Sequence, residues 1–213
     1  MTDILPSYSR MEQCVFLWFH NCPCGGELKL VERTSSSYKG KRLDKIRSRC
    51  AQCGEDVIFV FDCAYNPDHE PEPGHINPPE TTSVIVDPLQ WLHGAAHFLH
   101  LTDDEGPAIS SKARAALVLN ALGCVREALK FIPQDGQEIP RAALRGKLSR
   151  AFARQNPDSL KRVSLERMRD RLSALAASLG AVDSTSWWEL WEKTQHSAGQ
   201  AEKPDESESG GCS

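Results

Sequence analysis

The 213-residue sequence lacks the features of several large classes of protein. Its apolar runs are all far shorter than the roughly 20 residues that a helix needs to cross a bilayer. Residues 1–24 show no basic segment followed by an apolar core, so no secretory signal peptide is expected. The sequence also contains no Gly-rich phosphate loop, nucleophile elbow or dinucleotide fingerprint. We therefore expect a cytoplasmic protein that has no membrane partner and is not an enzyme.

The net charge is small as well, because 25 Lys and Arg residues oppose 29 Asp and Glu residues. This near-balance conceals blocks of opposite sign. Residues 27–49 carry eight basic and three acidic side chains, and residues 107–181 carry fourteen and six. Residues 50–90 carry eight acidic and no basic side chains, and residues 182–213 carry seven acidic side chains and two lysines. Two basic regions are thus separated by one acidic segment and followed by another.

Two closely spaced pairs of cysteines stand out among the eight in the chain. One residue separates Cys22 from Cys24, and two residues separate Cys50 from Cys53. Cytoplasmic thiols stay reduced, so such pairs indicate metal ligands before disulfides. Zinc prefers four tetrahedral nitrogen or sulfur ligands in structural sites, and two thiolate pairs supply them. We predict a structural zinc ion held by Cys22, Cys24, Cys50 and Cys53.

Glycines follow both pairs directly, and glycine permits the positive φ that a tight, metal-binding turn needs. On these turns, residues 14–63 resemble the zinc-ribbon family, in which such turns lie at the ends of small antiparallel strands. Cys50-Ala51-Gln52-Cys53-Gly54 matches the usual turn of that family. The first turn departs from it, because one residue instead of two separates Cys22 from Cys24.

That departure leaves alternatives open at the metal site. His20 is a candidate to replace Cys22, and Cys63 is a candidate additional ligand. An iron–sulfur centre bound by four thiolates and a set of reduced cysteines without metal are further interpretations. The remaining cysteines, Cys14, Cys63 and Cys124, lie in apolar surroundings and are expected in the core, whereas Cys212 lies in a polar tail.

The predicted fold class is α+β, with a small antiparallel zinc-ribbon-like β module (residues 1–66) followed by an α-helical bundle (residues 87–195). Clusters of β-branched and aromatic residues predict the strands. These strands are expected at residues 14–19, 28–32, 41–49 and 57–61, with a turn at residues 35–40. Residues 67–86 are acidic and Pro-rich, which favours an extended, solvated linker.

Apolar residues repeat with helical spacing in the second half of the chain. Asp87 before Pro88 predicts the start of the first helix, and Gly180 predicts the end of the fourth. Gly123 lies inside the second helix, where a close approach of another helix would explain it. Helices are predicted at residues 87–101, 111–131, 141–155 and 164–179, with a short Trp-rich helix from Ser186 and a disordered tail at 196–213.

Three histidines in the first predicted helix form a second candidate metal site. His93, His97 and His100 share one helix face because they are spaced by four and three residues. That face lies apart from the apolar stripe of the helix, so a solvated surface explains it without a metal. A metal-dependent enzyme would need these histidines, and no His-Glu-x-x-His pattern accompanies them.

The basic side chains of the β module are candidates for contact with nucleic acid, because phosphate binding depends on Lys and Arg. They are Lys39, Lys41, Arg42, Lys45 and Arg47. No base-reading motif accompanies them. The sequence therefore favours a non-catalytic zinc-binding adaptor or regulatory protein that binds a protein partner, with a nucleic-acid-binding protein as the alternative.

Overall fold

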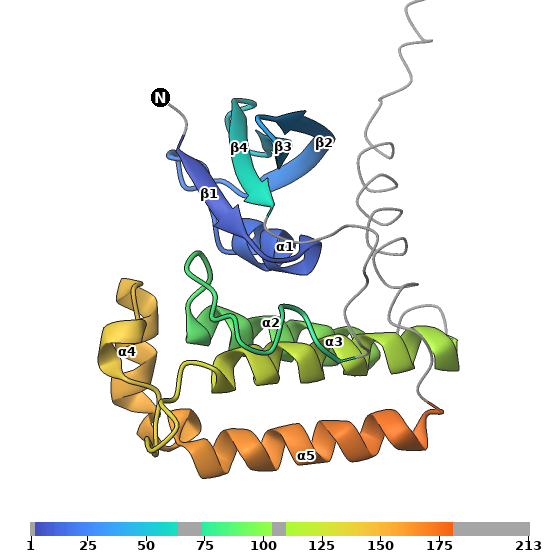
Figure 1. Ribbon diagram of the computed structural model, residues 1–213, viewed down its shortest axis with the longest axis vertical. Helices are drawn as coiled ribbons and strands as arrows, with labels where there is room; N and C mark the ends of the chain where they lie inside the picture. Colours follow the sequence, from blue (N-terminus) through green and yellow to red (C-terminus); the bar gives the residue numbers. More distant parts are fainter. Residues whose placement is uncertain (1–2, 64–73, 104–109, 181–213) are drawn as a thin grey trace, which may run out of the picture.

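Strands occupy the first part of the chain and most helices the second, which confirms the α+β prediction (Figure 1). The structure is a computed structural model that describes residues 3–63, 74–103 and 110–180. The predicted Trp-rich helix, the predicted tail and Cys212 lie outside these residues. The elements are β1 (Ile4–Ser7), α1 (Arg10–Trp18), β2 (Leu28–Tyr38), β3 (Lys41–Cys50), β4 (Asp56–Cys63), α2 (Pro88–Asp103), α3 (Ser111–Leu129), α4 (Lys147–Gln155) and α5 (Arg162–Ser178), with 3-10 turns at Arg141–Ala143 and Pro157–Leu160.

The sheet has the order β1-β4-β3-β2. Its pairs β2–β3 and β3–β4 are antiparallel, as predicted. The added edge strand β1 runs parallel to β4, so the sheet is mixed. The sequence does not predict β1, because its four residues, which include Pro6, show no alternation of apolar and polar side chains. Its place at the edge of the sheet is where a strand tolerates proline.

The turn between β2 and β3 is shorter than predicted. Tyr38 pairs with Lys41, so residues 35–38 belong to the strand and the turn consists of Lys39 and Gly40. Both residues have positive φ, 51° and 76°, which is the backbone of the two-residue turns that match strand twist. The serines at 35–37 are thus strand residues, held by ladder hydrogen bonds that their composition does not predict.

Residues 10–18 form helix α1, so the strand predicted at residues 14–19 is wrong. Ser9 caps the helix, since its side chain accepts a hydrogen bond from the Glu12 backbone N–H at 3.0 Å. Glu12 is the N3 residue of a capping-box sequence, but its carboxylate accepts from the N–H of Tyr8, one residue before the Ser9 cap, at 2.6 Å. A continuous apolar run is compatible with a buried strand and with a buried helix, because it has no helical or strand periodicity. Here the N-terminal cap favours the helix.

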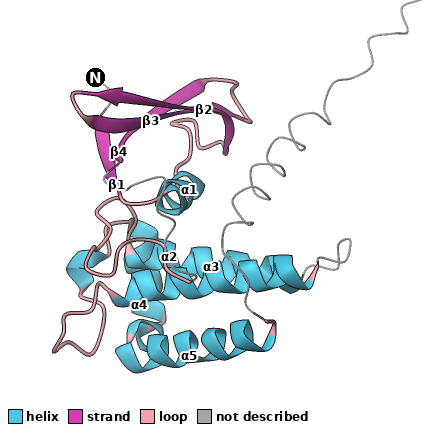
Figure 2. Cartoon of the chain, turned by 45° about the vertical axis from the view of Figure 1, so that its right-hand side comes forward, coloured by secondary structure: helices cyan, strands magenta, loops and turns pink. Residues whose placement is uncertain are grey.

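Helix α1 lies between the sheet and helix α2 (Figures 1 and 2). Its residues from Glu12 to Leu17 are all buried. On the sheet side, Gln13 Nε2 donates to Asp44 Oδ2 at 3.3 Å and to Cys63 Sγ at 3.4 Å. One hydrophobic cluster runs through all three layers and includes Val15 and Phe16 of α1, Ile46 and Phe61 of the sheet, Trp91 and Phe98 of α2, and Val118 and Val125 of α3.

The described part of the predicted linker is packed, so the expectation of a solvated segment is wrong for residues 74–86. Ile76, Asn77, Ser83 and Val86 are all buried. A Cβ atom added to Gly123 would lie 2.8 Å from the Ile76 side chain, so this glycine admits the segment against α3. The close approach expected at Gly123 therefore exists, but its partner is this segment and not another helix.

The helical part follows the predictions closely except at two starting points. Asp87 Oδ1 accepts from the N–H groups of Leu89 and Gln90, which confirms the predicted cap of α2. Helix α4 begins at Lys147 and not at residue 141, and α5 begins at Arg162, two residues before the predicted Ser164 cap. Gly180 follows α5 with φ 67°, as predicted. No helix in the described ranges is long and apolar enough to cross a membrane.

Two buried carboxylates lie where α1, the segment 74–86 and α3 meet. Glu127 Oε1 accepts from Lys130 Nζ at 2.7 Å and from the Asn77 N–H at 3.0 Å. Burial raises the pKa of Glu127 to about 7, against the opposing attraction of Lys130. Burial also raises the pKa of Glu12, and the Glu12 carboxylate adds to the rise in the pKa of Glu127.

Glu127→Gln is expected to change how stability depends on pH. The raised pKa of Glu127 means that its stabilising contribution is full below the unfolded value and is lost as pH rises through about 7. The variant lacks this loss. The free energy of unfolding in urea should therefore be measured for both proteins. The difference, variant minus natural protein, should increase by about 2 kcal/mol between about pH 5 and about pH 8.

Glu166→Gln serves as the control, because Glu166 lies on the surface of α5 with Arg162 at 3.8 Å. Its pH profile should run parallel to that of the natural protein. Parallel profiles for Glu127→Gln as well would show that Glu127 titrates as an ordinary surface glutamate.

Candidate metal centre

The four predicted cysteines come together at one end of the sheet. Cys22 and Cys24 lie in the turn between α1 and β2, Cys50 ends β3, and Cys53 lies in the turn before β4. Their sulfur atoms all lie within 4.8 Å of one another. Within residues 3–63, 74–103 and 110–180, this is the one group of three or more His, Cys, Asp or Glu side chains that could hold a metal ion.

The sulfur distances fit one tetrahedral ion better than disulfides. Cys22 Sγ lies 3.6 Å from Cys53 Sγ, and Cys24 Sγ lies 3.5 Å from Cys50 Sγ. A disulfide would bring two sulfurs to about 2.05 Å. Four thiolates around one zinc ion, each at about 2.3 Å, lie about 3.8 Å apart. Both of these distances join a cysteine of the first turn to a cysteine of the second, as a shared ion requires.

The first turn is shaped by glycine. The Gly25 N–H donates to the Cys22 carbonyl at 2.7 Å, and the Cys22 N–H donates to the Gly26 carbonyl at 2.9 Å. Gly25 has φ 91°, a conformation that side chains with a Cβ rarely adopt. Gly26 is needed for space instead, because a Cβ there would lie 2.6 Å from Cys50 Sγ and 2.7 Å from Gln52 Cβ. These two glycines let the first turn approach the second.

Backbone N–H groups point at the sulfurs in both turns. The Gly26 N–H donates to Cys24 Sγ at 3.4 Å. Those of Gln52 and Cys53 donate to Cys50 Sγ at 3.4 and 3.5 Å. Such donors stabilise the thiolate over the thiol, and thiolate is the form that binds metal.

The thiols differ in acidity for the same reason. The Cys53 N–H lowers the pKa of Cys50 to about 6, and the Gln52 N–H acts in the same direction, while burial of the thiol opposes both donors. The Glu55 N–H lowers the pKa of Cys53, but the neighbouring Cys24 and Cys50 outweigh it and raise that pKa to about 12. Adjacent thiolates repel each other, so the full set of four ionises only when a cation lies among them.

The two alternative ligands lie outside the cluster. His20 stacks on Phe16 with ring centroids 3.7 Å apart, and its Nδ1 lies 2.9 Å from the Phe16 carbonyl oxygen. Cys63 is buried beside Gln13 and pairs with Arg42 at the opposite end of β3 from Cys50. Cys14 and Cys124 are buried too, as predicted for the core, although Cys14 lies on a helix.

The three histidines of α2 do not form a metal group in the described structure. His93, His97 and His100 are exposed, as the sequence pattern predicts. Two of them contact aromatic rings at the end of α1. The ring centroids are 5.0 Å apart for His97 and Trp18, the last residue of α1, and 5.9 Å apart for His93 and Phe19, its C-cap. These contacts belong to the seam between α1 and α2, which the sequence pattern did not reveal.

Most of the basic side chains proposed for nucleic-acid contact are paired with acids. Lys41 bonds to Asp62 at 2.5 Å, and Arg42 contacts the buried Asp44 at 3.4 Å. Arg47 bridges Glu32 and Asp56 at 3.0 and 3.2 Å. Lys39 lies in the exposed turn and Lys45 is exposed on β3. The cross-strand acids that neutralise this surface are not apparent from sequence blocks, because strand register brings them there.

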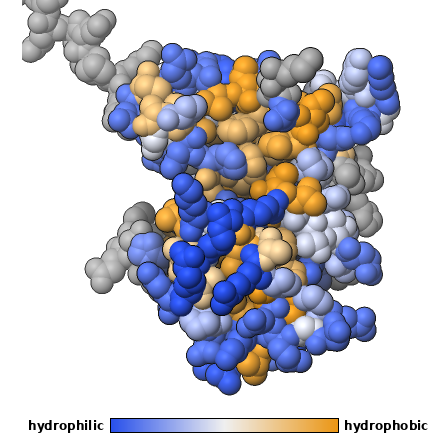
Figure 3. Space-filling model, turned by 90° about the vertical axis from the view of Figure 1, so that its left-hand side faces the viewer, coloured by the Kyte–Doolittle hydropathy of each residue, from blue (hydrophilic) through white to orange (hydrophobic). Residues whose placement is uncertain are grey.

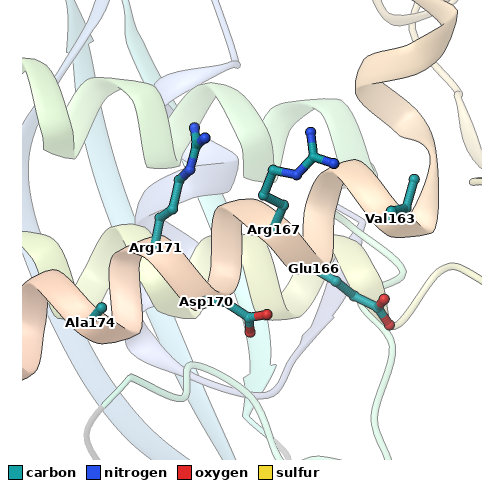
Figure 4. A pocket seen from close by; sticks show the side chains of 6 residues that line it. All are labelled: Val163, Glu166, Arg167, Asp170, Arg171 and Ala174. Atoms are coloured by element: carbon teal, nitrogen blue, oxygen red, sulfur yellow. The ribbon is translucent and has the colours of Figure 1, made fainter.

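A shallow groove runs along the outer face of α5 (Figure 4). Arg167 and Arg171 form one side, and Glu166 and Asp170 the other. All six lining residues belong to one helix, so the groove is an open surface and not an enclosed site. Sequence reasoning missed it because alternating charges on a helix face are normally solvated.

Known proteins offer no guide to this arrangement, since no family model, curated protein or solved structure matches the chain.

Gly26→Ala is expected to weaken metal binding by at least about tenfold, comparable with the loss of a supporting contact around a metal. The added methyl group would collide with Cys50 Sγ and the backbone-anchored Gln52 Cβ. Competition with a chromogenic zinc chelator would measure the affinity.

Gly25→Ala is the matched control at the neighbouring position. The added Cβ would meet no atom within 4 Å, so the substitution destabilises the fold only through the backbone strain at a φ of 91°. We expect lower stability, by about 1 kcal/mol, with metal affinity changed less than in Gly26→Ala. Equal affinity for Gly26→Ala and the natural protein would mean that the cysteine turns are farther apart than described.

Proposed function

We propose that the chain is a zinc-binding protein whose metal is structural and which acts by binding a protein partner. The observation that carries the proposal is the group of four thiols within 4.8 Å, contributed by two separate turns. Four thiolates complete the tetrahedral shell of zinc and leave no position open for a substrate. Catalysis at this metal is therefore not proposed.

Zinc is preferred to an iron–sulfur cluster because of the sulfur spacing. Tetrahedral sulfur sites accept either zinc or iron chemistry. A cluster places several iron and sulfide atoms among the cysteines and would hold their sulfurs farther apart than a single ion does. The distances of 3.5 and 3.6 Å between sulfurs of opposite turns suit a single ion.

The proposed ion would tie the end of α1 to the sheet. Only residues 19–21 separate the end of α1 from Cys22 in the first cysteine turn, and the second turn joins β3 to β4. The Ala51 N–H donates to the Glu27 carbonyl at 2.9 Å, one backbone link between the two turns. A metal crosslink adds folding free energy where a small sheet supplies little of its own.

A partner-binding role is supported by apolar side chains exposed on the helices. Leu148 of α4 is 84% exposed, and Val163 of α5 is 58% exposed. Nucleic acid remains a second candidate through Lys39 and Lys45, which the cross-strand acids do not pair. The ion pairs at Lys41, Arg42 and Arg47 make this β surface less suited to phosphate than its composition suggests.

Metal analysis tests the proposal directly. Protein purified without added zinc should contain about one zinc per chain, and Cys50→Ser should lose it. Removal of zinc by a strong chelator should lower the melting temperature, because binding free energy contributes to folding. Mass spectrometry under native conditions reports the stoichiometry, and circular dichroism reports melting.

Cys14→Ala is the control, since Cys14 is buried in α1 away from the cluster. It should keep its zinc. A protein without metal, or with iron and labile sulfide, would overturn the proposed centre. A second zinc that His97→Ala removes would instead point to the histidines of α2 and to an enzyme.

A further inference from the structure

Helix α4 and the turn before it form the most uniformly basic stretch of the described chain. Residues 139–157 contain five basic residues and no acidic residue. All five are exposed. They are Arg141, Arg145, Lys147, Arg150 and Arg154.

The helical periodicity gathers three of these charges on one face. Lys147, Arg150 and Arg154 are spaced by three and four residues, which places them side by side along α4. Figure 3 views the molecule from the side on which α4 lies and shows strongly hydrophilic residues gathered at the centre of that side. In the described structure neither Lys147 nor Arg154 forms an ion pair. Arg150 donates to the carbonyls of Leu144 and Arg145. Among the described residues, no acidic side chain forms an ion pair with these three.

An apolar strip runs beside the charges. Leu148 is 84% exposed, the largest exposure among the big apolar side chains of the described residues. Ala151 and Phe152, three and four positions further, are partly exposed. A leucine left in water within a basic surface gains free energy if a partner covers it. We define the α4 face as Lys147, Leu148, Arg150, Ala151 and Arg154.

The α4 face is held in place by contacts on its inner side. Asp87, the buried cap of α2, also accepts from Ser149 Oγ at 2.7 Å and from the Gly146 N–H at 3.4 Å. Phe152 packs against His93 with ring centroids 5.9 Å apart. One carboxylate thus fixes the first turns of two helices, so the exposed face presents its charges without rearrangement of the backbone.

We propose that the α4 face binds an acidic, amphipathic segment of a protein partner. Carboxylates of such a segment would pair with the two arginines and Lys147, and one of its apolar side chains would cover Leu148. The phosphate backbone of a nucleic acid would satisfy the charges but would leave Leu148 exposed. This inference rests on the protein-binding half of the proposed function and names the chemistry of that partner.

Binding can be measured with a fluorescein-labelled helical peptide that has one glutamate-rich face and one leucine-rich face. The full-length zinc-loaded chain should raise its fluorescence anisotropy. Arg150→Glu combined with Arg154→Glu should weaken binding at least about tenfold. Leu148→Ser should weaken it by about tenfold as well, through lost apolar burial. The matched control, Lys39→Glu combined with Lys45→Glu, makes the same charge change on the β2–β3 hairpin and should leave binding unchanged.

Rescue and competition separate this surface from general attraction of polyanions. A peptide with lysine in place of glutamate should bind the charge-reversed variant better than the natural protein. The proposal is overturned if polyglutamate or a single-stranded oligonucleotide binds as tightly as the amphipathic peptide, or if Leu148→Ser has no effect. A carbodiimide crosslink from Lys147 to acidic residues beyond residue 180 would also overturn it, because the occupant would then belong to this chain. Zinc content, measured on the same samples, shows separately whether the metal centre stands.

Discussion

Burial of helix α1 between the sheet and α2 is the constraint on which the other parts depend. Val15 and Phe16 share one cluster with Phe61 of β4 and Trp91 of α2, so the apolar core continues across α1. A sheet that is covered on one face by a short helix gains apolar burial, and the proposed metal would add to its stability. The position of α1 also fixes the position of the first cysteine turn, which follows the helix closely in the chain.

The cysteine centre and the helical layers therefore have a common support. Cys22 follows α1, while Gln13 of the same helix hydrogen-bonds to Asp44 and Cys63 in the sheet. On the other side of α1, buried Glu12 interacts electrostatically with Lys130 and Glu127 of the helical part. Polar groups at these depths are costly unless partnered, so they specify how the layers meet more than they strengthen the contact.

Patterns with a local physical cause were predictable. The cap formed by Asp87 and Pro88, the positive φ at Gly180 and the broad apolar stripe of α3 all depend on neighbours in sequence, and all three occur as expected. The β-branched and aromatic residues at 14–19 predict a strand, but such an apolar run fits a buried helix equally well. Ser9 and Glu12, which form the start of α1, lie earlier in the chain than this run. The segment 74–86 reads as solvated by composition, but its few apolar residues pack against Gly123.

The sequence alone determined that Cys22 shares a turn with Cys24 and that Cys50 shares a turn with Cys53, because cysteines so close in sequence lie together in any fold. It also determined the helical spacing that puts Lys147, Arg150 and Arg154 on one face. Only the tertiary structure decided that the two cysteine turns meet and that Cys63 and His20 lie outside the cluster. It also decided that Lys41 and Arg47 of the basic β surface pair with Asp62, Glu32 and Asp56. These outcomes depend on strand register and helix packing, which join residues distant in sequence and leave no local signature.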